Sequence, residues 1–222
     1  MSRVSQKQIV SFIGVLSIPL TLLLLFLFFS SFISPQGIES SSIPGKSEVE
    51  QKIEVAMSLR KVIETKAMEP WGICAGPGGK IYISDRGSND VLIMSKEGEL
   101  LSSLERRNRQ EELILEPTGL CWDEYSQSLF LADSGHHRIA VFSAEGDLRF
   151  TFGKRGKGAG EFQRPVGVAS DGRGRIFVAQ VDEARLQVFD EQGKFLKGRN
   201  AQELGMDFLW DVACLPTGDI VL

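Results

Sequence analysis

Histidine and cysteine are scarce in this chain, which has two histidines and three cysteines among 222 residues. The cysteines lie far apart and form no C-x-x-C pair, so the sequence supports neither a disulfide framework nor a zinc knuckle. His136 and His137 are adjacent. Adjacent side chains at a strand end point to opposite faces, so the two are poorly placed to chelate one ion. We therefore expect no bound metal and no cofactor.

Motifs that mark common catalytic and nucleotide-binding sites are also missing. The sequence has no G-x-S-x-G, no P-loop and no H-E-x-x-H. Its glycine-rich stretches at 76–79 and 153–160 fall between predicted strands and not before a helix, which disfavours a phosphate cradle. We assign no catalytic residue and expect that the protein is not an enzyme.

A pattern of proline, glycine and aspartate recurs along the C-terminal two thirds of the chain. Its copies begin at Pro70, Pro117 and Pro165, which are 47 and 48 residues apart, and a fourth copy opens at Leu209. Apolar residues at every second position, separated by Gly, Asp and Asn turns, predict four short antiparallel strands in each copy. Repetition at this period is typical of a β-propeller, whose blades pack on one another.

The order of these motifs resembles the NHL repeat family. The match is closest in the second copy, at Pro117, Gly119, Ala132–Asp133, His136–Ile139, Val141–Phe142 and Phe152–Gly153. The third copy departs from the family pattern at Gln180, and the fourth has Asp211 in place of the glycine. The resemblance covers residues 69–222. It implies an all-β fold, an NHL-type β-propeller with repeats at 70–107, 117–153, 165–198 and, truncated, 209–222.

The sequence ends at Leu222, within a predicted strand of the fourth copy. Propellers usually close with about 4–8 blades, so we expect an incomplete propeller of about three and a half blades. A truncated product and a ring closed by two chains are both open interpretations. Either way, an open strand edge would favour self-association.

The N-terminus has the longest apolar run, 25 uncharged residues at positions 9–33. As a helix it would exceed the roughly 30 Å hydrocarbon core. We expect a cytoplasmic tail at 1–8, a single transmembrane signal anchor at 9–33, and a linker at 34–68 with a short stalk helix within 47–66. Arg3 and Lys7 precede the run, which favours a cytoplasmic N-terminus and lumenal or extracellular repeats. The alternative is secretion after signal-peptide cleavage.

Loop residues are the candidates for partner binding, because loops bear recognition while strands provide packing. One set lies in the predicted loops between second and third strands and comprises Arg86, His136, His137 and Asp182. A second set is an outer basic patch in loops that follow the last strand of a blade, and comprises Arg106, Arg107, Lys154 and Arg155. Asp85 and Asp133 also end strands, where a carboxylate serves structure by accepting backbone N–H groups.

We interpret the chain as a membrane-anchored, non-catalytic propeller scaffold for protein–protein interaction with an unknown protein partner. One alternative is an RNA-binding or ubiquitin-pathway scaffold similar to the tripartite-motif NHL proteins; another is a fragment of an amidating-lyase-like enzyme. Nucleic acid is disfavoured because residues 69–222 hold 18 Lys and Arg against 24 Asp and Glu. The lyases use a multi-histidine zinc site that two histidines do not supply.

Overall fold

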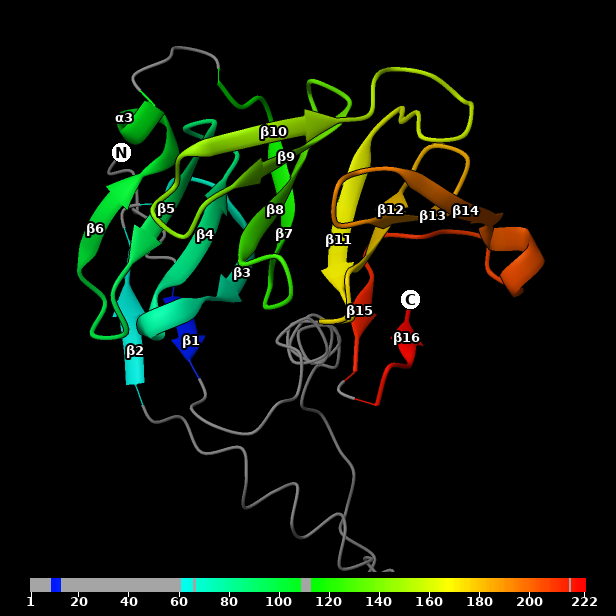
Figure 1. Cartoon of the computed structure of the whole chain (residues 1–222). Helices are drawn as coiled ribbons and strands as arrows, with labels where there is room; N and C mark the ends of the chain where they lie inside the picture. Colours follow the sequence, from blue (N-terminus) through cyan, green and yellow to red (C-terminus); the bar gives the residue numbers. More distant parts are fainter. Residues whose placement is uncertain (1–8, 13–60, 66, 109–112, 216) are drawn as a thin grey trace, which may run out of the picture. The chain divides into compact units, whose positions relative to one another are not determined.

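The computed structural model describes residues 9–12, 61–65, 67–108, 113–215 and 217–222 (Figure 1). The chain divides into two compact units. In the first, β1 (Ile9–Phe12) pairs antiparallel with β2 (Lys61–Glu64). The second unit contains all the described residues from Ala67 to Leu222.

Both strands of the first unit differ from the helices expected there. Ile9–Phe12 was expected to begin the transmembrane helix, and Lys61–Glu64 to lie in the stalk helix, yet each is extended. Neighbouring β-branched residues, Ile9–Val10 and Val62–Ile63, favour strands over helices. The rest of the expected anchor and stalk lies outside the described residues. Within the described ranges, no helix has the length and apolar character needed to cross a membrane.

The second unit contains three four-stranded antiparallel sheets, each made of strands that are consecutive in the sequence. The first has β3 (Pro70–Ala75), β4 (Ile81–Asp85), β5 (Asp90–Met94) and β6 (Leu100–Ser103). The second has β7 (Pro117–Asp123), β8 (Ser128–Asp133), β9 (Arg138–Phe142) and β10 (Leu148–Phe152). The third has β11 (Pro165–Ser170), β12 (Arg175–Gln180), β13 (Arg185–Asp190) and β14 (Phe195–Asn200).

Shorter elements complete this unit. A two-stranded sheet of β15 (Ala213–Cys214) and β16 (Ile220–Val221) follows the third sheet. The helical segments are η1 (Pro77–Gly79), α3 (Leu104–Asn108) and η2 (Ala201–Leu204). The all-β prediction and the prediction of four strands in a repeat are confirmed for these three sheets.

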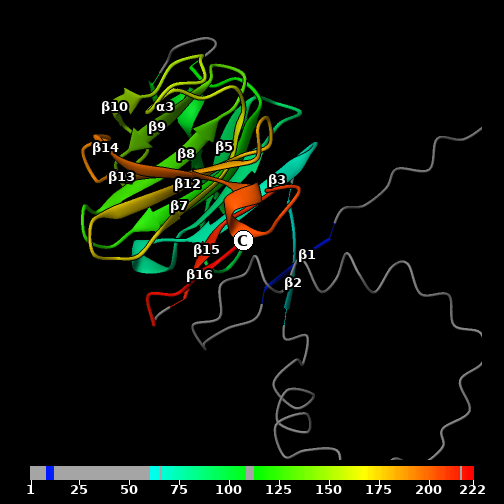
Figure 2. The same cartoon turned by 90° about the vertical axis from the view of Figure 1, so that its right-hand side faces the viewer.

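The first strand of each sheet lies innermost. β3 packs against β7, β7 against β11, and β11 against β15, so successive sheets meet through these strands (Figures 1 and 2). The second strands are almost fully buried, whereas the last strands, such as β14, are mainly exposed. This decrease in burial from the second strand to the outermost strand of each sheet is that of stacked propeller blades.

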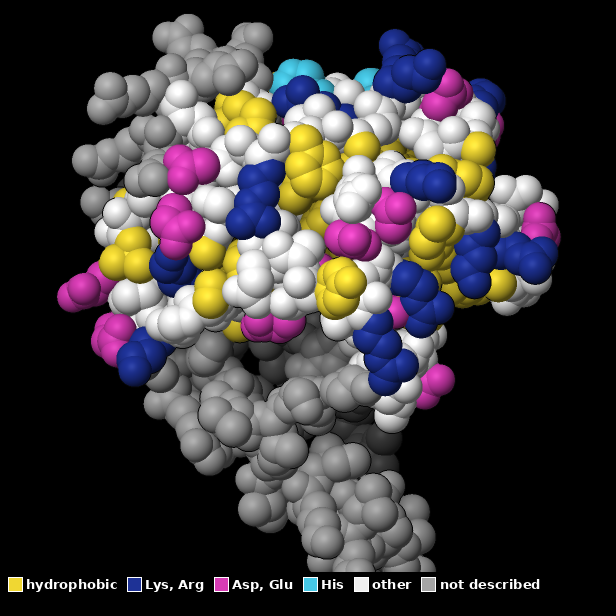
Figure 3. Space-filling model, viewed as in Figure 1, with side chains coloured by type: hydrophobic (Ala, Val, Ile, Leu, Met, Phe, Trp, Pro, Cys, Tyr) yellow, Lys and Arg dark blue, Asp and Glu magenta, His cyan; other side chains and the backbone are white. Residues whose placement is uncertain are grey.

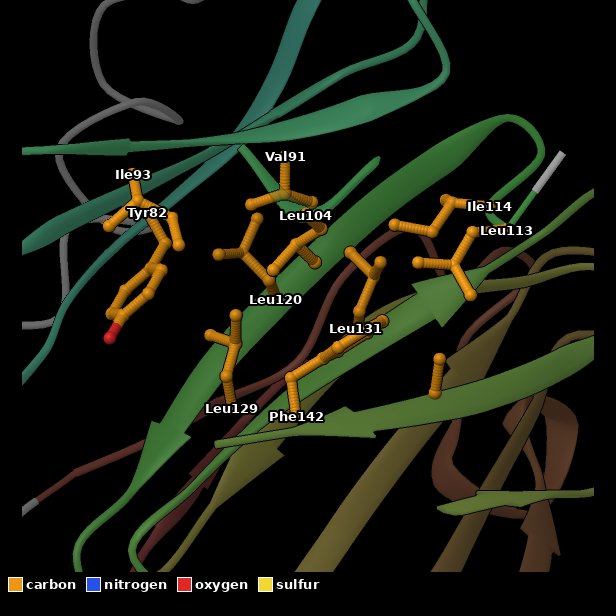
Figure 4. Packing of buried hydrophobic residues seen from close by; sticks show 11 residues of the cluster. Tyr82, Val91, Ile93, Leu104, Leu113, Ile114, Leu120, Leu129, Leu131 and Phe142 are labelled. Carbon is orange, nitrogen blue, oxygen red and sulfur yellow. The ribbon is translucent and has the colours of Figure 1, made fainter. Parts of the chain in front are cut away.

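Hydrophobic side chains fill the spaces between successive sheets. Figure 4 shows the cluster between the first two sheets, where Tyr82 and Val91 meet Leu120, Leu131 and Phe142. A second cluster joins the second sheet to the third, and a third joins the third sheet to the residues around Leu209. Ile83, Leu131 and Val178, which were expected in the core, are all buried.

The glycine of the repeat allows the inner strands to approach closely. A Cβ added at Gly119 in β7 would lie 2.5 Å from the carbonyl oxygen of Val166 and 2.9 Å from the Cα of Gly167 in β11. Both atoms belong to backbone, so a side-chain rotation cannot relieve the overlap. The sheet-to-sheet distance therefore requires glycine at this position of the repeat.

Candidate functional site

The loops between second and third strands lie beside the residues that enter the inner strands. The last residue of each second strand pairs with the repeat proline of the same sheet: Asp85 with Pro70, Asp133 with Pro117, and Gln180 with Pro165. We define the loop face as the residues at this end of the sheets, namely 67–69, 86–89, 113–116, 134–137, 154–164 and 181–184. In Figure 3 the histidines of this face lie at the upper edge, with Lys and Arg side chains beside them.

Six of the eight predicted contact residues lie on the loop face. Arg86, His136, His137 and Asp182 are in the loops between second and third strands, and Lys154 and Arg155 are in the segment between β10 and β11. Arg106 and Arg107 belong to the helix α3, which follows β6 where a loop was expected and begins beside Asp90, whose carboxylate accepts a hydrogen bond from the Glu105 N–H at 3.0 Å. Asn108 ties α3 to the β9–β10 turn through Gly146 and Leu148.

Asp133 organises the loop of the second sheet. Its fully buried carboxylate accepts hydrogen bonds from the Leu115 N–H at 2.8 Å, from His136 Nδ1 at 2.9 Å and from Arg138 Nε at 2.7 Å. Arg138 also donates through Nη2 to the carbonyl oxygen of Leu113 at 2.9 Å. The Asp, His and Arg of the repeat therefore hold the chain that enters β7.

Asp85 has the same position in the first sheet but different partners. It accepts hydrogen bonds from the Met68 and Glu69 N–H groups and from Ser88 Oγ. Burial opposes ionisation of this carboxyl, but the hydrogen bonds outweigh burial and lower its pKa below the usual value. In the third sheet the amide of Gln180 replaces the carboxylate. Its Nε2 donates to the Asp182 carbonyl oxygen at 3.2 Å, and its buried Oε1 has no hydrogen-bond partner among the residues that the structure describes.

The two histidines have separate partners. His136 contacts Asp133, whereas Nδ1 of His137 contacts the carbonyl oxygen of Gln163. Burial, and then the charges of Arg155 and Arg164, lower the pKa of His137. Across the part of the chain that the structure describes, no group of three or more His, Cys, Asp or Glu residues is arranged to hold a metal ion.

Two lysines of the loop face are paired with carboxylates. Lys154 lies 3.3 Å from Glu161, and Lys157 lies 2.7 Å from Glu183. The glycine-rich segment is similarly engaged, because the Gly158 N–H donates to the Glu161 carboxylate and the Gly160 N–H to Gln187 Oε1. Figure 3 likewise shows Lys and Arg interspersed with Asp and Glu. These pairs divide the positive charge instead of leaving a continuous cationic track.

The sequence analysis did not identify the large apolar side chains next to the inner strands as candidate contact residues. Met68 and Trp71 flank the start of β3 and are 65% and 48% exposed. Phe208 and Trp210 flank Leu209, the counterpart of the repeat proline, and are 71% and 62% exposed. Their position in the repeat could have identified three of them in the sequence, because Trp71, Phe208 and Trp210 each adjoin the proline position of their repeat. Exposed aromatic residues of this size are typical of protein-binding surfaces.

Asp211 departs from the repeat and lies in a buried environment. Its Oδ1 is 2.5 Å from the place that a Cβ on Gly167 would take, and it accepts a hydrogen bond from the Val212 N–H at 2.8 Å. Burial raises the pKa of Asp211 to about 6. The folded state therefore binds this proton more tightly than the unfolded chain does, and the resulting stability is lost as the pH rises from about 4 through about 6.

Replacing this carboxyl by an amide is expected to stabilise the protein at neutral pH. Asp211→Asn should increase the free energy of unfolding at pH 7 by roughly 1–3 kcal/mol, because it removes the cost of ionising a buried group. Its stability should also vary less than that of the wild type between about pH 4 and pH 6. Thermal unfolding across this range, with Asp219→Asn as the exposed control, measures both effects. If the stability of Asp211→Asn depends on pH in the same way as that of the wild type, the raised pKa of Asp211 is contradicted.

Consecutive four-stranded antiparallel sheets that pack through their first strands define a β-propeller repeat region. The family model described as SMP-30/gluconolactonase/LRE-like region matches residues 73–199. The chain belongs to this family.

Curated relatives agree with this assignment. The chain is 50% identical over 46 residues to Protein lin-41, and 48% identical over 44 residues to the B-box type zinc finger protein ncl-1, both of Caenorhabditis elegans. These matches cover 21% and 20% of this chain but only 4% and 5% of the relatives. The identification as an NHL-type repeat protein is thereby confirmed.

Solved structures share the fold. A chain of the nidogen/laminin complex has a TM-score of 0.56 at 19% identity, with 76% of this chain and 58% of that chain covered. Catalytically inactive virginiamycin B lyase from Staphylococcus aureus with quinupristin has a TM-score of 0.54 at 14% identity, with 72% and 51% covered. The chain thus spans about half the length of these propellers. At such identities the likeness extends to the fold alone.

Proposed function

We propose that this chain is a membrane-anchored, non-catalytic β-propeller scaffold that binds a protein partner through its loop face. The observation that supports protein binding most strongly is the exposure of four large apolar side chains: Met68 on the loop face, and Trp71, Phe208 and Trp210, which adjoin the proline positions of their repeats. Trp and Arg dominate the energetics of protein interfaces, and Arg86 lies over the Trp71 ring at 5.1 Å. A non-catalytic role is favoured because both histidines already contact protein groups.

RNA is the rival partner, and the charge pattern disfavours it. Binding of a phosphate backbone requires cations that are free to replace its counterions. On the loop face, Lys154 and Lys157 already pair with Glu161 and Glu183. A protein partner requires no such continuous positive track.

Charge reversal on the loop face tests the scaffold. Arg155→Glu should reduce recovery of the partner in affinity precipitation from native membranes by about fivefold or more. The reason is that it reverses the charge of an exposed side chain at the proposed interface. Lys197→Glu, on the exposed strand β14, is the matched control and should leave recovery unchanged. RNA recovery should stay at background for all three proteins. Strong RNA crosslinking that Arg155→Glu abolishes would replace the protein partner by RNA.

Membrane anchoring rests on the sequence of the N-terminus. Even without the strand Ile9–Phe12, residues 13–33 contain no charge, and a helix of this length would reach about 30 Å. We expect the full-length chain to resist carbonate extraction from microsomes and its repeats to be protected from added protease. Release into the carbonate supernatant after insertion would instead indicate a cleaved signal peptide and a secreted protein.

A further inference from the structure

Two arginines from different loops converge on one carboxylate of the loop face. Arg86 Nη2, in the loop after β4, lies 3.5 Å from Glu116 Oε2. Arg164 Nη2, just before β11, lies 3.6 Å from the same oxygen. Glu116 precedes β7, so three successive sheets each contribute one of these side chains. The side chains of Arg164 and Glu116 are 53% and 44% exposed, which leaves the group open to solvent.

Arg86 is held in place without Glu116. Its guanidinium lies over the Trp71 ring at 5.1 Å, and its backbone N–H donates to the Glu69 carbonyl oxygen at 3.0 Å. Its Nε is shielded from solvent and has no hydrogen-bond partner within the described part of the chain. At 3.5 Å, the contact with Glu116 is also longer than the roughly 2.7–2.9 Å of a strong charge-assisted hydrogen bond. The guanidinium is therefore fixed in position but only partly satisfied.

The backbone of Glu116 is in a strained conformation. Its φ is 47°, in the left-handed region, although the next residue is a proline. A residue before proline prefers extended backbone, and residues held in such strained conformations cluster at functional sites. Its counterparts Glu69 and Arg164 do not have positive φ. Asn89 Oδ1 accepts a hydrogen bond from the Glu116 N–H at 2.8 Å and supports this conformation.

We propose that Arg86 and Arg164 form a clamp for a carboxylate of an acidic segment in the protein partner, and that Glu116 occupies this clamp in the free chain. The inference rests on the proposed scaffold function and specifies the chemistry of the partner. The clamp already accommodates a carboxylate, and the exposed Trp71 beside it adds an apolar contact. An acidic peptide is favoured over a nucleic acid because the neighbouring lysines are paired with glutamates.

Glu116 then acts as an internal competitor that sets the affinity. Glu116→Gln keeps the side-chain shape but removes the competing charge, so it should tighten the binding of an acidic peptide by about threefold or more. Arg164→Gln removes half of the clamp from an exposed position and should weaken binding by about fivefold or more. In the double variant, Arg164→Gln should also abolish most of the gain in affinity that Glu116→Gln produces alone.

Fluorescence anisotropy of a labelled (Glu-Ser)3 peptide with the purified full-length chain measures these effects. Its matched (Gln-Ser)3 peptide should not bind. Arg173→Gln, an exposed arginine in the β11–β12 turn, is the control variant and should bind like the wild type. Circular dichroism and thermal unfolding establish that each variant is folded.

Several results would overturn the clamp. These are equal peptide affinity for Arg164→Gln and Arg173→Gln, no gain for a folded Glu116→Gln, or tighter binding of oligouridylate with the same dependence on Arg164. Failure of the clamp is distinguishable from failure of the scaffold. A partner whose recovery falls with Arg155→Glu but not with Arg164→Gln would leave the scaffold standing and refute the clamp alone.

Discussion

Gly119→Ala is expected to lower the free energy of unfolding by about 3 kcal/mol. The added methyl group would lie 2.5 Å from the Val166 carbonyl oxygen, so the second and third sheets would have to move apart. Overpacking of this kind typically costs about 1–3 kcal/mol, and relief is hardest where the neighbour is backbone. Denaturant unfolding of the full-length chain, monitored by tryptophan fluorescence and circular dichroism, measures the loss.

Gly198→Ala is the matched control for this prediction. A Cβ at Gly198 in β14 would have its nearest neighbours at 3.5 Å, which is ordinary van der Waals contact. Its effect should stay within about 0.5 kcal/mol, as for most exposed substitutions. Equal stability of the Gly119→Ala and Gly198→Ala proteins would mean that the inner strands do not approach as closely as described.

Asp133→Ala is expected to lower the free energy of unfolding by about 3–5 kcal/mol, the range for removing one partner of a buried ion pair. It would leave the Leu115 N–H, His136 and the guanidinium of Arg138 without their common acceptor. Because those groups hold the chain entering β7, we also expect faster proteolysis next to Leu115. Asp133→Asn should lower the free energy of unfolding by less, since its side-chain oxygen still accepts hydrogen bonds.

Asp219→Ala is the control for the aspartate prediction. Asp219 is exposed and accepts a hydrogen bond from Thr217 Oγ1 at 2.8 Å. We expect its stability to stay within about 0.5 kcal/mol of the wild type. If Asp133→Ala is as mild as Asp219→Ala, the buried network does not organise the loop face.

The repeat made most of the sheet structure predictable. Period-two apolar residues and the turns after Asp85 and Asp133 predicted the strands, and the strict register of the prolines identified which strands are equivalent. The first unit was less predictable. Ile9–Phe12 belongs to an apolar run that suits a helix or a strand, and only its pairing with Lys61–Glu64, far away in the sequence, distinguishes the two.

The loop face was predictable in outline but not in its contacts. Loop position alone pointed to Arg86, His136, His137 and Asp182. The convergence of Arg86 and Arg164 on Glu116 depends on how three sheets stack, which no single repeat encodes.

Site-specific photocrosslinking in cells tests the central claim, that the loop face binds a protein. Benzoylphenylalanine would replace Met68 on the loop face or, as a matched exposed hydrophobic control, Leu196 on β14. We predict a discrete, RNase-resistant protein adduct from position 68 and none from position 196. Equal adducts from both positions, no adduct from position 68, or an adduct that RNase removes would contradict the claim.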